Sequence, residues 1–191
     1  METKKYIILG TLLALLVVLV VLFFQTGEEK RKRTPASSAL EPEVSTAEVP
    51  ETKTVQLFFL SEDDSLFHSE EREIFSDSSL VSEARQVVEE LLKGSHNGYI
   101  SPFPPQTKLR ELFIIREGIV YVDFSREIQD KHLSGATAEV STVYSVVNSL
   151  TYNFPPIKKV FLLVDGSEKE TLKGHVDISR PLVPMYGLIS R

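Results

Sequence analysis

The sequence contains no cysteine among its 191 residues. This absence excludes disulfide bonds, thiolate metal sites, a cysteine nucleophile and a lipid-modified N-terminal cysteine. Basic residues are scarce over most of the chain: beyond residue 33 there are 15 Lys and Arg against 24 Asp and Glu, a net charge of −9. Because proteins bind the phosphates of DNA and RNA through clustered Lys and Arg, we expect no nucleic-acid binding.

Sequence patterns of common enzymes are missing as well. The four histidines, His68, His96, His132 and His175, show neither HExxH nor His-x-His spacing. No G-x-S-x-G or P-loop sequence occurs. We therefore interpret the histidines as solvated loop residues, and we expect no catalytic residue, no metal site and no cofactor. A zinc site assembled from distant histidines and aspartates is the alternative.

A group of acidic residues follows the first predicted strand: Glu62, Asp63, Asp64, Glu70 and Glu71. Carboxylates can bind a hard cation, but this group lacks the alternating spacing and the fixed glycine of a calcium loop. We interpret it as an irregular and solvated segment, with a cation site as the alternative.

The segment GSHNG, residues 94–98, follows a predicted helix instead of preceding one. Its backbone amides therefore lie at the end of the helix dipole that does not favour anions. We interpret the segment as a helix stop followed by a turn. The rest of the loop, up to residue 107, contains three prolines, so no regular element is expected there.

The chain has one long uncharged run, residues 6–24, in which 15 of 19 residues are Leu, Ile, Val or Phe. As a helix this run is about 28 Å long, close to the roughly 30 Å hydrocarbon thickness of a bilayer. A cleaved signal peptide is the alternative, but the run exceeds the usual apolar length and no small-x-small site follows it. We predict an uncleaved signal anchor, a single transmembrane helix that contacts the lipid bilayer.

We divide the chain into three parts. Residues 1–33 form the anchor with its basic flanks, and residues 34–52 form an acidic tether rich in Pro, Ser and Glu. Such a composition buries too little apolar surface to offset its ordering entropy, so we predict a disordered tether. Residues 53–191 form the globular domain. Lys and Arg lie on both sides of the apolar run, so the positive-inside rule does not decide the orientation.

Hydrophobic periodicity predicts the elements of the domain. Strands are expected at residues 55–60, 73–75, 109–115, 119–124, 158–166 and 175–178, and helices from residue 80 to a stop at Gly94 and over residues 135–152. The third and fourth strands should form a hairpin, and the apolar strand 158–166 should be central. The order β(β)αββαβ(β) indicates an α+β fold, with two helices packed on one mixed, mainly antiparallel sheet.

The second predicted helix has a stripe of apolar residues at intervals of three and four: Ala136, Val140, Val143, Val147 and Leu150. This spacing places the stripe on one face of the helix. We expect that face to pack against the sheet.

A five-residue pattern, Val-Asp-apolar-Ser-Arg, occurs twice, once around Asp123 and once around Asp177. In the structural interpretation, the two aspartates shape turns by accepting hydrogen bonds from backbone amides. In the functional interpretation, Arg126 and Arg180 lie close together and bind a carboxylate of a partner.

Five segments follow one another in a recognisable order: VQLFFL with a later Arg72, a helix ending in LLKG before a proline loop, a hairpin ending in VYVDFS, the run NSLTYNFPPIKKVFLLVDG, and the closing GHVDISRPL. Together they cover about residues 53–184 and resemble the GerM-type (GerMN, sporulation and spore germination) domain. Members of that family often have proline where this chain has Ser95. The resemblance implies an extracytoplasmic module without enzymatic activity. It therefore implies a bacterial inner-membrane protein with a cytoplasmic N-terminus and a periplasmic domain.

From these observations we expect a noncatalytic interaction module of the cell envelope. Its partner would be another envelope protein or peptidoglycan. A cell-wall hydrolase or hydrolase regulator with an atypical site is one alternative. A component that self-associates into rings or sheets is another.

Overall fold

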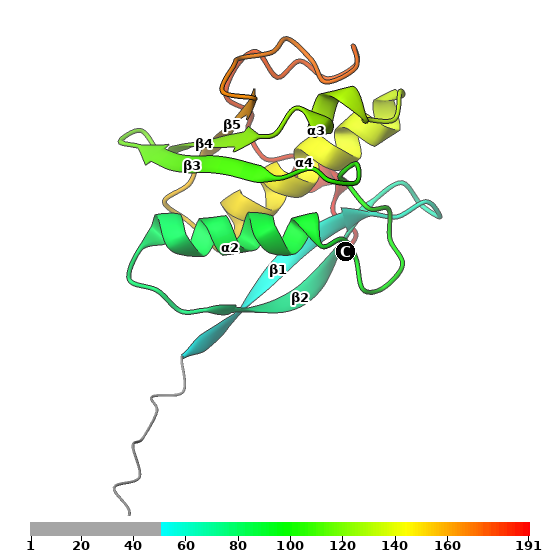
Figure 1. Cartoon of the computed structure of the whole chain (residues 1–191). Coiled ribbons are helices and arrows are strands. Elements are labelled where there is room, and N and C mark those ends of the chain that lie inside the picture. The colour runs from blue at the N-terminus through cyan, green and yellow to red at the C-terminus, as the bar shows by residue number, and fades with distance from the viewer. Residues whose placement is uncertain (1–50) are drawn as a thin grey trace, which may run out of the picture. The chain divides into compact units, whose positions relative to one another are not determined.

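Two β-sheets and two long helices make up the part of the chain that the computed structural model describes, residues 51–191 (Figure 1). The elements are β1 Thr52–Leu60, β2 Phe67–Phe75, α2 Leu80–Leu92, β3 Leu109–Ile115, β4 Ile119–Phe124, α3 Glu127–Asp130, α4 Ala136–Asn153, β5 Lys159–Val164 and a 3-10 turn Tyr186–Leu188. The predicted membrane anchor and nearly all of the tether lie outside these residues. Within them, no helix combines the length and hydrophobicity needed to cross a bilayer.

The strands form two sheets rather than the single sheet expected from the sequence. β1 and β2 pair antiparallel along their whole length, from Thr52 opposite Phe75 to Leu60 opposite Phe67. The second sheet has the order β3-β4-β5, with β3 and β4 antiparallel and β4 and β5 parallel. Figure 1 shows why the sheets are separate, because α2 and α4 lie between them. The α+β class is confirmed, and the single-sheet expectation is wrong.

The hairpin β3-β4 is confirmed with the predicted bounds. Its turn contains Gly118, which has a φ of +73° and whose carbonyl accepts a hydrogen bond of 2.7 Å from the backbone N–H of Lys158. A side chain at this position would come within 2.5 Å of the carbonyl oxygen of Pro156. Glycine is therefore required both for the turn and for the close approach of the segment that leads into β5.

Helix α4 is buried on every side between residues 141 and 151, not only along its apolar stripe. It contacts β1 of one sheet and β5 of the other. Two of its buried polar residues bond to backbone groups of neighbouring segments: Ser149 Oγ accepts from the N–H of Phe58 at 3.0 Å, and Asn148 Oδ1 accepts from the N–H of Met185 at 2.9 Å. These bonds connect the helix to β1 and to the C-terminal segment.

Two strand predictions near the ends of the domain need correction. The short strand at 73–75 is the end of the longer β2, which begins at Phe67. No strand forms at 175–178, and the backbone instead pairs with β5 further along, where Val160 and Leu182 exchange two hydrogen bonds of 3.0 and 2.8 Å. The central strand of the second sheet is β4, and β5 lies beside it.

A buried carboxylate on α4 explains why residues 175–178 are irregular. Glu139 is fully buried and accepts hydrogen bonds from the backbone N–H groups of His175 and Val176, both at 3.1 Å, and from His175 Nδ1 at 2.8 Å. These backbone donors are therefore not available for pairing with a strand. Burial by itself raises the pKa of Glu139, but the hydrogen bonds from His175 and from the nearby backbone outweigh it and lower the pKa.

The domain should therefore become less stable in acid, partly because the Glu139 carboxylate is protonated there. The ionised carboxylate contributes stability above the ordinary glutamate pKa of about 4.3, and this contribution is lost as the pH falls through the lower pKa of the folded state. In Glu139→Gln this part of the pH dependence should be missing, whereas Glu117→Gln, in an exposed turn, should retain it. Unfolding midpoints measured by circular dichroism between about pH 3 and 7 test this, and parallel profiles for Glu139→Gln and wild type would contradict it.

Candidate binding site

The loop between α2 and β3, residues 95–107, is irregular as predicted, yet it is held in place at several points. We call it the proline loop, after Pro102, Pro104 and Pro105. The backbone N–H of Ile100 in its middle donates a 3.0 Å hydrogen bond to the carbonyl of Leu60 at the end of β1. Buried polar side chains hold the loop on either side of this bond.

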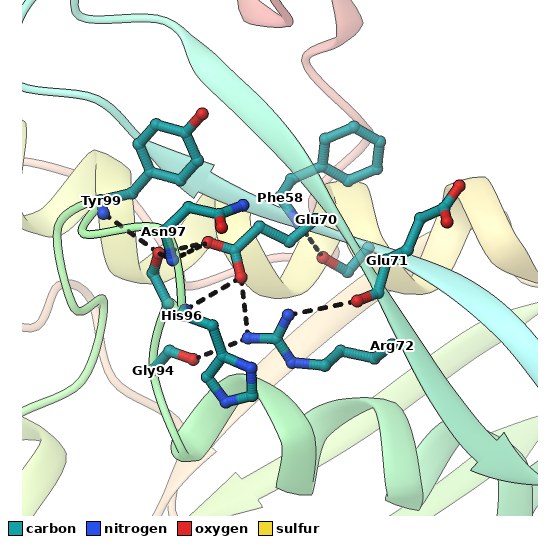
Figure 2. A network of polar contacts seen from close by, with 10 residues as sticks. Phe58, Glu70, Glu71, Arg72, Gly94, His96, Asn97 and Tyr99 are labelled. Atoms are coloured by element: carbon teal, nitrogen blue, oxygen red, sulfur yellow. Dashed lines mark hydrogen bonds and ion pairs between the residues drawn. The ribbon is translucent and has the colours of Figure 1, made fainter.

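The first anchor of the proline loop is Glu70 on β2 (Figure 2). Its side chain is almost fully buried and accepts hydrogen bonds from the backbone N–H groups of His96 at 3.0 Å and Asn97 at 3.1 Å, and from the hydroxyl of Ser95. The amides after the helix stop therefore do bind a carboxylate, contrary to the prediction for residues 94–98. They do so because a turn can direct consecutive amides at one anion without any contribution from a helix N-terminus.

Arg72, two residues further along β2, completes this anchor. Its Nη2 lies 2.7 Å from Glu70 Oε2 and also donates to the carbonyl of Gly94 at 3.2 Å (Figure 2). Burial raises the pKa of Glu70, but the bonds from Ser95, His96 and Arg72 outweigh this effect and lower the pKa. The carboxylate is therefore ionised at neutral pH and paired with a buried cation.

The interpretation of the acidic group as solvated is wrong for Glu70 and is correct for exposed neighbours such as Glu62 and Glu71. The alternation of residues along β2 carries a sequence signal for this anchor. Along β2 the inward positions alternate with outward ones, so that Glu70, Arg72 and Ile74 share one face. Opposite charges two residues apart in an alternating strand indicate such a pair.

The second anchor lies on α4 and involves a histidine that was expected to be solvated. Thr142 Oγ1 donates to the carbonyl of Pro102 and lies 2.8 Å from His132 Nε2. The other ring nitrogen, Nδ1, lies 2.6 Å from the carbonyl of Leu133, and it carries the proton because a carbonyl only accepts. His132 is buried, whereas His68 forms a partly exposed pair with Asp64 at 2.9 Å.

Between these anchors the proline loop forms one wall of a cavity of about 320 Å³. The other walls are the segment 131–133 and the first turns of α4. The lining is mainly apolar, and its residues are Ile100, Ser101, Pro102, Phe103, Pro104, Pro105, Lys131, His132, Leu133, Ala138, Ser141 and Thr142. Small-molecule and peptide sites have this composition, apolar walls with a few polar groups.

The histidine and the threonine in the cavity wall contact fixed neighbours. His132 Nδ1 donates to the carbonyl of Leu133, and Thr142, whose hydroxyl oxygen lies 2.8 Å from Nε2, donates to the carbonyl of Pro102. Among residues 51–191, no cluster of three or more His, Asp or Glu side chains is placed to hold a metal ion. The arrangement offers a shaped apolar surface with walls that are held by buried bonds.

The two aspartates of the repeated pattern have different surroundings. Asp123 is buried at the end of β4, where it accepts from the N–H of Gly166 at 2.8 Å and from Arg110 Nη1 at 2.9 Å. Asp177 is exposed, and it accepts from the N–H of Ser179 at 2.9 Å. Hydrogen bonds from the hydroxyl of Ser179 and from the adjacent guanidinium hold the pKa of Asp177 well below its ordinary value.

The two arginines of the pattern bind carboxylates within their own segments. Arg126 Nε lies 3.8 Å from Asp130, and Arg180 Nη2 lies 2.8 Å from Asp177. In the part of the chain that the structure describes, no ion pair joins the two arginines through a shared carboxylate. The shared anion clamp stays a prediction without support from these contacts.

Removing these arginines should have little effect on stability. Because exposed ion pairs contribute little, Arg126→Ala and Arg180→Ala, singly and together, should leave the thermal unfolding midpoint unchanged within about 1 °C. Differential scanning calorimetry provides the measurement. A loss of several degrees in either variant would show that the arginines have a structural role that their contacts do not indicate.

The domain resembles known proteins in family and in fold. A family model described as "Germane: Sporulation and spore germination" matches residues 56–170, more than half of the chain. The first GerMN domain of the sporulation protein GerM from Bacillus subtilis superposes with a TM-score of 0.53 at 24% identity, covering 69% of this chain and 97% of that one. The tandem GerMN domains of the same protein give 0.57 at 24% identity, with 70% and 46% covered. No curated protein matches the sequence.

Proposed function

This chain belongs to the Germane family of sporulation and spore germination, and we propose that it is a membrane-anchored envelope protein whose domain binds a partner without catalysis. The apolar run at residues 6–24 supports the anchor, and the acidic segment that follows supports a tether. In this proposal the N-terminus is cytoplasmic and the domain faces the outer side of a bacterial inner membrane. The partner is another envelope protein or peptidoglycan.

The observation that carries the proposal is the cavity behind the proline loop. Its walls are fixed by two buried polar anchors, Glu70 with Arg72 and Thr142 with His132. Because these bonds already hold the walls in place, the surface loses less conformational entropy when a partner binds. Leu133, one of the residues that line the cavity, exposes 78% of its surface and is therefore accessible to a partner. A preformed apolar site of this kind is typical of recognition.

Site-directed photo-crosslinking in living cells tests the proposal. A photoreactive residue replaces Leu133 in the full-length protein, and a matched variant carries it at Val183, another exposed apolar position outside the cavity. We expect an adduct in the membrane fraction from position 133 and not from position 183. Mass spectrometry should identify the adduct as an envelope protein or a peptidoglycan fragment. Identical products from both positions, or a cytoplasmic partner, would contradict the proposal.

A further inference from the structure

The second sheet has one face against α2 and α4 and one face turned away from them (Figure 1). The strand register places Phe113, Tyr121 and Phe161 in one row across the outward face. Their rings pack side by side, with centroids 4.8 Å apart for the first pair and 5.1 Å apart for the second. Phe113 is 45% exposed, and Ile115, two residues closer to the hairpin turn, is 39% exposed. The turn end of this face therefore presents large apolar side chains to the surroundings.

Three basic residues surround the same turn. Arg116 lies in the turn itself, and the backbone N–H groups of Lys158 and Lys159 donate hydrogen bonds of 2.7 and 3.2 Å to the carbonyl of Gly118. All three side chains are exposed, and within residues 51–191 none of them forms an ion pair. The turn also contains the exposed Glu117, so this group carries a net charge of +2.

The rest of the domain has the opposite sign. Residues 51–191 contain 15 Lys and Arg against 21 Asp and Glu, a net charge of −6. We call Phe113, Ile115, Arg116, Lys158 and Lys159 together the hairpin tip. It combines exposed apolar side chains with unpaired cations at one end of an acidic domain.

We propose that the hairpin tip docks the domain on the surface of a bilayer that contains anionic lipid. Apolar and aromatic side chains favour the headgroup level of a bilayer, where Ile115 and Phe113 would lie. The three cations pair with lipid phosphates, and the long lysine stems contact the apolar boundary. Because the remaining surface is acidic and is repelled by the same lipid, the charges favour a single orientation of the domain. The inference rests on the membrane anchor of the proposed function.

The length of chain before the domain favours a bilayer over an acidic protein as the occupant. The apolar run ends at residue 24, and the 26 residues from there to Glu51 can extend to at most about 90 Å. A domain of this size is about 35–40 Å across, so the hairpin tip can reach the bilayer in any orientation. Since an anchor in the same bilayer supplies a high effective concentration, a few weak contacts are sufficient for docking.

Docking by the hairpin tip leaves the cavity accessible. Figure 1 shows α3 at the end of the second sheet opposite to the hairpin turn, and Leu133 follows α3 in the chain. The apolar site of the proposed function therefore faces away from the bilayer when the hairpin tip contacts it.

Fluorescence quenching by lipid tests the inference, because the chain contains no tryptophan and a single introduced one reports its own surroundings. Full-length Ile115→Trp is placed in nanodiscs of equal parts phosphatidylglycerol and phosphatidylcholine, the latter with brominated acyl chains that quench tryptophan on contact. We expect the emission to lose about half of its intensity relative to unbrominated nanodiscs. In nanodiscs of brominated phosphatidylcholine alone the loss should be much smaller, since that surface has no net negative charge. Leu133→Trp, at the exposed position beyond α3, should lose less than about a tenth in either lipid.

Two triple variants in the Ile115→Trp background test the role of the cations. Glutamine at the three basic positions of the hairpin tip should reduce the quenching to the level of Leu133→Trp. The control removes the same charge from exposed lysines elsewhere and should keep the quenching; its substitutions are Lys93→Gln, Lys131→Gln and Lys173→Gln. Salt at about 1 M, where charges are screened beyond about 3 Å, should act like the first triple variant.

Equal quenching at positions 115 and 133, equal quenching in anionic and neutral nanodiscs, or equal effects of the two triple variants would each overturn the inference. If the hairpin tip instead binds an acidic protein, position 115 stays unquenched in these particles, and the proposed envelope function stands without membrane docking. A full-length protein that does not enter nanodiscs contradicts the anchor of the proposed function, and this inference with it.

Discussion

Replacing Glu70 by alanine is expected to lower the free energy of unfolding by about 3–5 kcal/mol, because it leaves the buried guanidinium of Arg72 without its carboxylate. Three hydrogen bonds from the proline loop to Glu70 disappear at the same time, from Ser95, His96 and Asn97. The loss therefore combines an unpaired buried charge with the release of the loop. Urea unfolding monitored by circular dichroism measures the change.

The neighbouring residue provides the matched control. Glu71 is exposed on the other face of β2, where it accepts a 3.1 Å hydrogen bond from Gln56 Nε2. Because it removes no buried partner, Glu71→Ala should change the free energy of unfolding by less than about 0.5 kcal/mol. Equal effects for Glu70→Ala and Glu71→Ala would show that the buried network does not stabilise the domain.

The Glu70 variant also links stability to binding. The proline loop that Glu70 anchors continues into Pro102 and Phe103, which line the cavity. A loop that has lost its first anchor pays more conformational entropy when a ligand orders it. Under conditions where Glu70→Ala remains folded, we therefore expect less photo-crosslinked adduct from position 133 than in Glu71→Ala, although neither residue lines the cavity.

Local features of the fold were predictable because local sequence determines them. The hairpin β3-β4 has the predicted bounds, since alternating apolar residues flank a turn that ends in Gly118. Helix α2 begins at Leu80 with Ser79 as its N-cap and ends before Gly94, as its capping residues indicate. In each case the deciding residues lie within a few positions of the boundary.

Long-range features were not predictable from the same patterns. The periodicity of α4 identifies the stripe that includes Val143 but gives no sign that a second sheet covers its polar side. Small polar residues such as Ser149 resemble a solvated face in sequence, and only the position of β1 reveals that they are buried. Similarly, the proline-loop residues that bond to Glu70 lie 25 or more residues away from it, and Thr142 lies 10 residues from His132. Spacing within a motif does not encode such contacts.

The site was predictable only in part for the same reason. The proline content of residues 95–107 indicated an irregular loop, and the loop is the main wall of the cavity. Ala138 and Lys131 have no distinctive sequence pattern, and they line one cavity with the proline loop only because the fold brings distant segments together. The arginines of the repeated pattern, which do have a pattern, bind local carboxylates instead.

Val147→Asp and Val143→Asp are expected to unfold the domain altogether. Both valines are completely buried on α4, which is enclosed by β1 on one side and β5 on the other. A carboxyl group at either position loses its hydration without gaining a partner, which costs several kcal/mol against a total stability of about 5–15 kcal/mol. The cost of the lost valine packing adds to this.

Thr137→Asp is the matched control for this prediction, because it places the same carboxylate in the exposed first turn of the same helix. A negative charge there interacts favourably with the helix dipole, so this variant should unfold at or slightly above the wild-type temperature. The valine variants should show no cooperative transition in calorimetry. In an amphipathic helix, a rotation could bring the new carboxylate into water. Because α4 is buried on all sides, no such rotation is available to these variants. A soluble Val147→Asp protein with an unchanged melting temperature would therefore contradict the position of α4 between the two sheets.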